Sequence, residues 1–152
     1  MKTLARERDK AELLRRLKRL RGDSERRWGR MTAHQMVCHL SDGYRIQIGE
    51  RRTELAASPL PRPIMKVIAL YMPLKWPPGI RTTPDLDQDC GGTRPIDFEA
   101  DVAELARLLD RAGVPYHDLP ERVHPLFGGM SDVEWKRWAY LHADHHLRQF
   151  GV

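Results

Sequence analysis

The stretch SDVEWKRWAYLHADHHLRQF, residues 131–150, decides the fold because it predicts one long helix with a buried face. It begins with Ser131 and Glu134, which form the Ser-x-x-Glu pattern of a capping box. In such a box each side chain satisfies a backbone donor at the start of the helix. We therefore expect a helix from Asp132 to Phe150.

Two histidines on this helix, His142 and His146, are four residues apart. Each residue turns a helix by about 100°, so the two rings lie about 40° apart on one face, one turn from each other. Trp135 and Trp138 lie on the same face, and we expect both in the core. Buried imidazoles need hydrogen-bond partners, and a metal ion removes that need by taking one nitrogen of each ring. The pair therefore indicates a helical metal site, and the alternative is a pair of core histidines.

A second helix is predicted from Ala33 to about Gly49. Thr32 and Gln35 precede its apolar part as a Thr-x-x-Gln capping box. Apolar residues then recur at helical spacing and form a stripe: Met36, Leu40, Tyr44 and Ile48. His39 lies on the side of this stripe, so the second helix also offers a core-facing histidine.

We predict that His39 joins His142 and His146 as the third metal ligand. His34 and Cys38 form a rival i, i+4 pair on the same helix, and either could complete a closed structural site as a fourth ligand. Three imidazoles with an open position are the arrangement of a catalytic zinc site. Nickel, cobalt and iron(II) also accept imidazole ligands, so the residues favour zinc without fixing the metal.

The remaining segments complete an all-α fold. Helices are also predicted from Leu4 to Arg21 and from Ile96 to Ala112, with a short helix from Ile64 to Tyr71. Residues 73–95 carry closely spaced prolines and glycines, so we expect no regular element there. No strand pattern with a period of two is present. We predict a single domain over residues 1–152, a four-helix bundle with a long irregular crossover between its second and third helices.

The positive charge is concentrated in the first segment. Residues 1–30 contain 12 Lys and Arg against 5 Asp and Glu, a net charge of +7, whereas the rest of the chain has 14 against 16, a net of −2. Leu13 and Leu17 recur there at helical spacing, and no aromatic residue before Trp28 offers a base-stacking platform. We interpret the charges as a solvated helix face and expect no nucleic-acid partner.

The composition favours the cytoplasm. No apolar run reaches the roughly 18 residues that a membrane span needs, so we expect no membrane partner. Six of the first ten residues are charged, which argues against a signal peptide. The two cysteines, Cys38 and Cys90, are too few for a disulfide framework and suit a reducing compartment.

Three segments resemble the DinB-like superfamily of bacterial four-helix-bundle metalloproteins: WGRMTAHQMVCHL at 28–40, LKWPPGIRTTPDL at 74–86 and HPLFGGMSDVEWKRWAYLHADHHLRQFG at 124–151. The resemblance implies a metal triad with one histidine from the second helix and an H-x-x-x-H pair from the last. Those positions are His39, His142 and His146. It also implies frequent homodimers. Characterised relatives include transferases that use low-molecular-weight thiols such as mycothiol or bacillithiol, and one group isomerises maleylpyruvate with mycothiol.

The expected function is therefore metal-dependent transfer of a thiol sulfur to a small electrophilic substrate. The alternatives are a metal-dependent hydrolase and a non-catalytic, metal-stabilised interaction module. His145 borders the ligand face and is a weak candidate for proton transfer, or else a packing residue. Arg81 is a weak candidate to meet an anionic substrate group, in a loop from Trp76 to Thr83 that either closes over the metal or covers the end of the bundle. Asp144 is expected on the surface, about 200° around the helix from His142.

Overall fold

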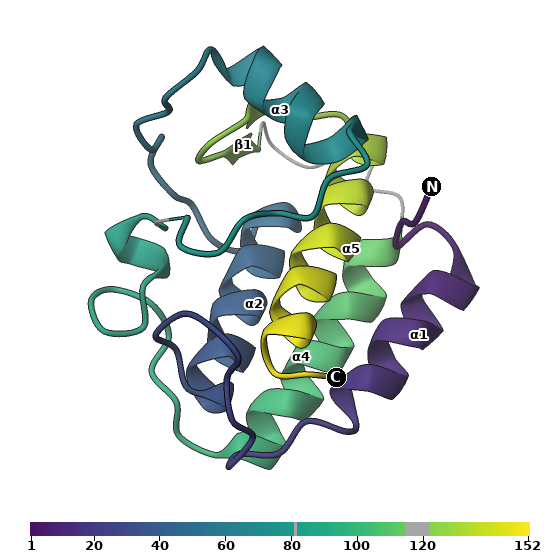
Figure 1. Ribbon diagram of the computed structural model, residues 1–152, viewed down its shortest axis with the longest axis vertical. Coiled ribbons are helices and arrows are strands. Elements are labelled where there is room, and N and C mark those ends of the chain that lie inside the picture. Colours follow the sequence, from purple (N-terminus) through teal and green to yellow (C-terminus); the bar gives the residue numbers. More distant parts are fainter. Residues whose placement is uncertain (81, 115–121) are drawn as a thin grey trace.

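A computed structural model describes residues 1–80, 82–114 and 122–152, and this part of the chain is mostly helical (Figure 1). Its helices are α1 (Glu7–Leu17), α2 (Ala33–Gln47), α3 (Arg62–Tyr71), α4 (Phe98–Gly113) and α5 (Asp132–Gln149). A short 3-10 helix, η1, covers Pro84–Leu86. Two short strands, β1 (Val123–His124) and β2 (Gly128–Gly129), pair antiparallel. The prediction of an all-α class is confirmed.

Four of the helices pack side by side around one core. α2 lies against α4 and α5, and α1 lies against α4 and α5 (Figure 1). α3 and the β1–β2 hairpin lie beyond one end of these helices, where α3 contacts α5. The largest fully buried side chains come from all four helices and include Leu13, Met36, Tyr44, Leu105 and Trp135.

Both predicted capping boxes are present. The Thr32 hydroxyl accepts a hydrogen bond from the backbone of Gln35, whose side chain accepts one from Thr32. Ser131 and Glu134 make the same reciprocal pair at the start of α5. Because each box satisfies otherwise unpaired backbone donors, it fixes where the helix begins. α2 and α5 therefore begin at the predicted residues.

The predicted bounds of the first helix were wrong at both ends. α1 covers Glu7–Leu17, whereas the apolar pattern predicted a helix from Leu4 to Arg21. Leu4 and Leu20 are buried with the core, but Leu4 lies in a turn before the helix and Leu20 follows the turn after it. The backbone N–H of Leu4 donates to the carbonyl of Lys136, which ties the N-terminal turn to α5. The apolar pattern in the sequence extends beyond the helix because the residues that flank the helix also contribute side chains to the core.

The segments predicted as irregular contain three short elements. η1 lies within residues 73–95 and begins with Pro84. Proline is tolerated there because the backbone N–H of the first helical residue has no partner within the helix. The two-residue strands β1 and β2 are too short to show a period of two, so the prediction of no strand was wrong. α3 begins two residues earlier than predicted, at Arg62, with Pro63 in its first turn.

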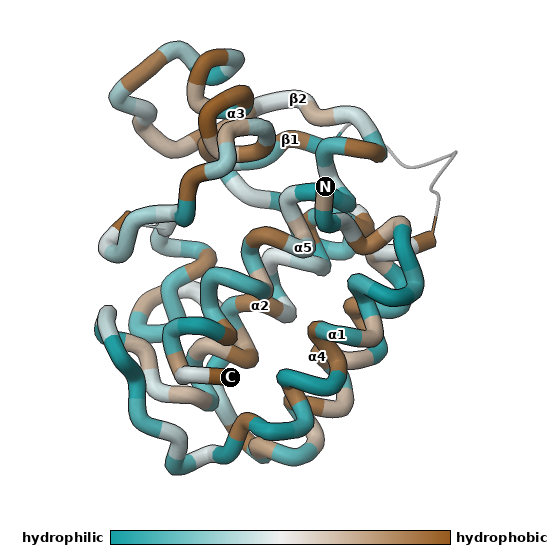
Figure 2. Tube along the Cα trace, turned by 45° about the vertical axis from the view of Figure 1, so that its right-hand side comes forward, coloured by the Kyte–Doolittle hydropathy of each residue, from teal (hydrophilic) through white to brown (hydrophobic). Residues whose placement is uncertain are grey.

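α4 begins at Phe98 and ends at Gly113, not at Ile96 and Ala112 as predicted. The Asp97 side chain accepts a hydrogen bond from the Ala100 backbone and fixes the start, which leaves Ile96 outside the helix. Figure 2 shows hydrophobic and hydrophilic residues alternating along the long helices, and mostly hydrophobic residues along α3. Among the described helices, none is both long and apolar enough to cross a membrane.

Candidate metal centre

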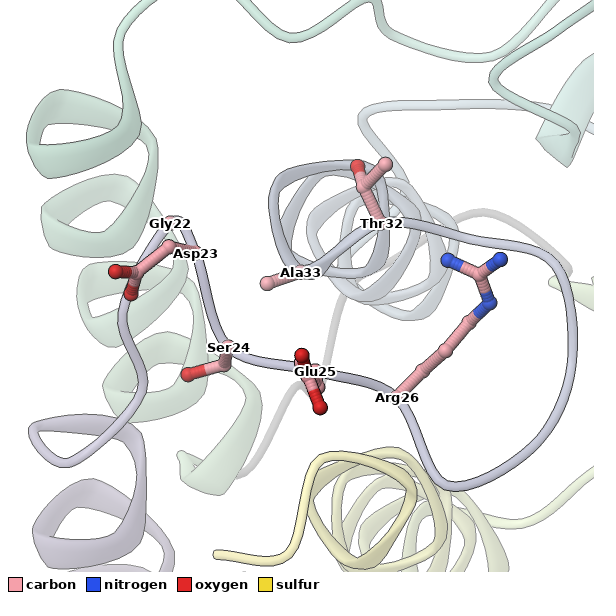
Figure 3. A pocket seen from close by; sticks show the side chains of 7 residues that line it. All are labelled: Gly22, Asp23, Ser24, Glu25, Arg26, Thr32 and Ala33. Carbon is pink, nitrogen blue, oxygen red and sulfur yellow. The ribbon is translucent and has the colours of Figure 1, made fainter.

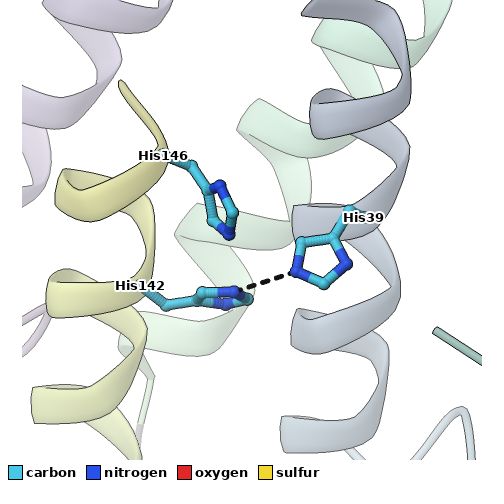
Figure 4. A group of neighbouring side chains, drawn as sticks. All are labelled: His39, His142 and His146. Atoms are coloured by element: carbon cyan, nitrogen blue, oxygen red, sulfur yellow. Dashed lines mark hydrogen bonds between the residues drawn. The ribbon is translucent and has the colours of Figure 1, made fainter. Parts of the chain in front are cut away.

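Three buried histidines meet between α2 and α5, as predicted. His39 comes from α2, and His142 and His146 come from successive turns of α5 (Figure 4). One ring nitrogen of each lies within 4.8 Å of the others, and the Nε2 atoms of His39 and His142 are 3.1 Å apart. Zinc bound tetrahedrally at about 2.1 Å holds its nitrogen ligands about 3.4 Å from one another. The three rings are therefore close to the spacing of one ion's ligands.

The His39 ring is oriented by a backbone carbonyl. Its Nδ1 lies 3.0 Å from the carbonyl oxygen of Leu86, in η1. A carbonyl only accepts hydrogen bonds, so Nδ1 must carry the proton and donate it. The neutral ring then has its lone pair on Nε2, the nitrogen that faces the other two histidines. η1 thus fixes His39 in the tautomer that a metal ligand requires.

The His146 ring is oriented by Gln149, a buried residue one turn further along α5. The Gln149 amide nitrogen donates to the carbonyl of Trp28 over 2.7 Å, so its Oε1 faces His146 Nδ1, 2.9 Å away. His146 therefore also carries its proton on Nδ1 and its lone pair on Nε2. Gly29 makes this possible: it has φ +79°, and a Cβ there would lie 2.5 Å from the Gln149 amide nitrogen.

His142 lies against α2 at a glycine. A Cβ on Gly43 would lie 3.3 Å from His142 Cε1 and 3.1 Å from the Trp138 ring. Trp138 also packs on His142, with ring centroids 4.7 Å apart, and both tryptophans of α5 are buried in the core as predicted. Within the described residues the buried Nδ1 of His142 has no hydrogen-bond partner. This ring is positioned by packing and by the 3.1 Å hydrogen bond between its Nε2 and that of His39 (Figure 4).

Burial keeps all three rings neutral. Desolvation lowers the pKa of His39, and lowers the pKa values of His142 and His146 well below that of a free imidazole. For His142 the neighbouring histidine His146 adds to the same effect. Neutral imidazole is the form that binds a metal, so the ligand form is present at neutral pH.

An aromatic wall adjoins the triad. The ring centroid of Trp76 lies 6.3 Å from that of His142 and 6.0 Å from that of His145. The ring centroid of Trp28 lies 5.9 Å from that of His145. His145 is half-buried, its Nδ1 has no partner among the described residues, and burial lowers its pKa to about 4. Part of the loop that begins at Trp76 thus lies beside the triad. Arg81, the other candidate of that loop, lies outside the described residues.

The rival pair His34 and Cys38 lies apart from the triad, with Asp101 of α4. His34 Nε2 is 2.7 Å from Asp101 Oδ2, and the Cys38 thiol donates to the same oxygen over 3.7 Å. Burial and the Asp101 carboxylate raise the pKa of Cys38 to about 12. In the described part of the chain neither residue joins the triad, and the triad has no fourth His, Cys, Asp or Glu ligand.

Asp42 is a supporting residue that the sequence analysis did not identify. It is fully buried on α2, one turn after His39, and accepts hydrogen bonds from Arg51 and from the backbone and hydroxyl of Thr93. These bonds attach residues 84–93, which carry the Leu86 carbonyl, to α2. The sequence does contain a signal for Asp42, which is its position three residues after His39. Residues three apart share one face of a helix, so a carboxylate there is expected to be buried beside the histidine.

Asp144 corrects one expectation. It is half-buried rather than on the surface, and its carboxylate binds Arg16 of α1 at 2.6 Å and Arg148 at 2.9 Å. α1 covers this side of α5, so the residue faces another helix instead of solvent. Asp144 therefore holds α1 and α5 together and takes no part in the triad.

A surface depression lies beside the start of α2, lined by residues 22–26 with Thr32 and Ala33 (Figure 3). It contains charged and hydroxyl side chains but no histidine or cysteine. It therefore does not coincide with the histidine triad, and we assign no chemistry to it.

Comparison with known proteins gives a family. The family described as "Protein of unknown function (DUF1569)" matches residues 6–151, nearly the whole chain, so the chain belongs to this family. No curated protein and no solved structure matches it. The arrangement of the histidines therefore carries the functional argument.

Proposed function

We propose that this member of the DUF1569 family binds one divalent metal ion through His39, His142 and His146, in a DinB-like four-helix bundle with a long crossover. The observation that carries the proposal is the meeting of three buried imidazoles, two of which are oriented through their Nδ1 atoms. Two of them are held with the proton on Nδ1 by Leu86 and Gln149, which leaves Nε2 for a ligand. Without an ion, the Nε2 atoms of His39 and His142 share one hydrogen bond, and a metal ion bound to both nitrogens would replace it.

Zinc fits the donor set best, because it takes imidazole ligands in tetrahedral sites of this spacing. Nickel, cobalt and iron(II) accept the same ligands. A bound divalent ion with an open position supplies Lewis acidity. The chain supplies no fourth ligand among its described residues, which favours a position open to a small molecule over a closed structural site.

The activity that we propose is transfer of a low-molecular-weight thiol to a small electrophile. Trp28, Trp76 and His145 adjoin the triad and would form one side of a substrate site. The unpartnered Nδ1 of His145 is neutral near pH 7, so it offers a lone pair to the proton that the thiol loses. The homodimer implied by the DinB-like resemblance is a further prediction.

Metal content of protein purified without an affinity tag tests the site. We expect about one equivalent in the wild type and loss of it in His39→Ala, His142→Ala and His146→Ala. His34→Ala is the matched control, because its ring binds Asp101 and lies outside the triad. A wild type that is metal-free and also fails to bind added zinc, nickel, cobalt or iron(II) would show that the histidines are structural, and would favour the interaction-module alternative.

Activity is tested separately, by screening metal-loaded protein with small thiols and electrophilic acceptors. We expect His145→Phe, which keeps the packing against Trp28 and Trp76, to retain metal and lose most of the transfer rate. General acid–base groups contribute about 10²–10⁴-fold, so the loss should lie in that range. If the acceptor is hydrolysed and no thiol is consumed, the proposed transferase activity is wrong and the metal-dependent hydrolase is the better assignment.

Replacing Gln149 by leucine is expected to weaken metal binding about 10–100-fold, the usual effect of removing the group that orients a ligand. The variant takes away the acceptor that holds His146 Nδ1 but keeps the size of the side chain. Isothermal titration of the apo protein with zinc measures the change. Gln47→Leu is the control: Gln47 is equally buried, and its amide donates to the carbonyl of Ala112 in α4 rather than contacting a histidine. Equal losses in both variants would mean that Gln149 acts only through stability.

A further inference from the structure

The outer side of α3 carries an unpartnered apolar stripe. Ile64, Val67, Ile68 and Tyr71 follow the i, i+3, i+4, i+7 spacing of one helix face, and each is between 40% and 51% exposed. Leu70, about 110° around the helix from the middle of this stripe, is fully buried. Apolar side chains of α3 therefore face both the rest of the chain and the solvent. Figure 2 shows that hydrophobic residues make up most of this helix.

Neighbouring residues extend this stripe. Leu60 precedes α3, and Met72 and Leu74 follow it, with exposed fractions of 44%, 47% and 63%. We refer to these three residues and the four of the stripe as the α3 outer face. Soluble monomers rarely expose apolar side chains in such a contiguous group, and a group of this kind usually marks a binding surface.

The chain segment that carries the α3 outer face has basic residues but no acidic ones. Residues 55–80 contain no Asp or Glu, but contain Arg62, Lys66 and Lys75. Lys75 is exposed, and Lys66 pairs with Glu134 of α5 at 3.0 Å. A second copy of this face would bring the same positive charges against it. An anionic lipid surface offers negative headgroups to the cations and acyl chains to the apolar stripe.

We propose that the α3 outer face binds an anionic phospholipid surface, with α3 lying in the plane of the headgroups. α3 lies at one end of the molecule, beyond the four packed helices, so it can contact a flat surface without their displacement (Figure 1). The Trp76 Nε1–H donates to the carbonyl of Ala69 and holds the segment after α3 against the helix. Such a surface leaves no long apolar run in the sequence, because its apolar residues recur at helical spacing within a ten-residue helix.

Co-sedimentation with vesicles tests this proposal. The full chain should bind vesicles of phosphatidylcholine with 30% phosphatidylglycerol and should bind pure phosphatidylcholine about tenfold less. Raising the salt concentration should weaken the binding, because the cations contribute through screened charges. The double variant Ile64→Ser/Val67→Ser should lose at least tenfold in partition. The control is Ile96→Ser/Val133→Ser, which removes two apolar side chains that are 91% and 67% exposed elsewhere.

Several outcomes would overturn the proposal. Absence of binding to the anionic vesicles is one, and equal losses in the test and control variants are another. Light scattering supplies a third: a dimer that Ile64→Ser/Val67→Ser dissociates would make the α3 outer face a contact between two copies. Circular dichroism confirms that each variant is folded. The measurement is made on apo and on metal-loaded protein, so its result does not depend on the proposed metal site.

Discussion

Replacing Asp42 by alanine is expected to lower the free energy of unfolding by about 3–5 kcal/mol, the usual cost of breaking a buried ion pair. The Asp42 carboxylate is fully buried. It accepts hydrogen bonds from Arg51 at 2.8 Å, from the Thr93 backbone N–H at 2.8 Å and from the Thr93 hydroxyl at 2.6 Å. Arg45 and Gln88 donate to it as well. Its removal leaves the partly buried Arg51 guanidinium without its carboxylate.

The same variant should weaken metal binding. Arg51 also donates to the carbonyl of Gly91 over 2.9 Å and to that of Asp85, so one arginine holds both ends of the segment that contains η1. Without Asp42 this segment is released, and the Leu86 carbonyl no longer fixes His39. We expect zinc affinity to fall about 10–100-fold, as for loss of any group that orients a ligand.

Urea unfolding of the apo protein and zinc titration measure the two effects of Asp42→Ala. Glu104→Ala is the matched control, because Glu104 also pairs with Arg45 but lies on α4, away from the segment with Leu86. It should cost less than about 1 kcal/mol, since the carboxylate is partly exposed, and should leave zinc affinity unchanged. Unchanged zinc affinity in a destabilised Asp42→Ala would show that the segment holds its position without the carboxylate.

Local patterns in the sequence predicted the long helices and the three histidines. Capping boxes depend on residues three apart, and the relation of His142 to His146 depends only on helical geometry, so both are visible in a single sequence. His39 could be chosen over His34 because it lay on the apolar stripe. The structure brings these three rings together.

The groups that orient the histidines could not be predicted in the same way. The acceptor for His39 is a backbone carbonyl 47 residues away, which has no side-chain signature. Gln149 lies one turn from His146, but its role depends on the carbonyl of Trp28, which lies 121 residues earlier. The partner of His34 and Cys38, Asp101, belongs to another helix. Such contacts are set by packing between segments, and helical periodicity describes only one segment at a time.

The apo protein is expected to unfold in acid at a higher pH than it would if only its carboxylates became protonated. Burial lowers the pKa of His124 to about 3 and of His145 to about 4, and places those of His142 and His146 well below normal. In the unfolded chain these groups bind protons near pH 6.5. Below that pH the unfolded state holds more protons than the folded state, so stability is complete above about pH 6.5 and falls as the pH decreases.

The four groups together give a slope of about 5 kcal/mol per pH unit well below pH 6.5, which is four times the value for one proton. A domain with a typical stability of about 5–15 kcal/mol should then reach its acid midpoint between about pH 3.5 and 5.5. Urea unfolding at several pH values, with a chelator present, measures this slope. In His124→Asn the amide oxygen can replace Nδ1 as acceptor for the Leu126 and Phe127 backbones, but the group no longer titrates. Its slope should be smaller by about 1.4 kcal/mol per pH unit, and a slope equal to that of the wild type would mean that His124 is protonated in the folded state as readily as in the unfolded chain.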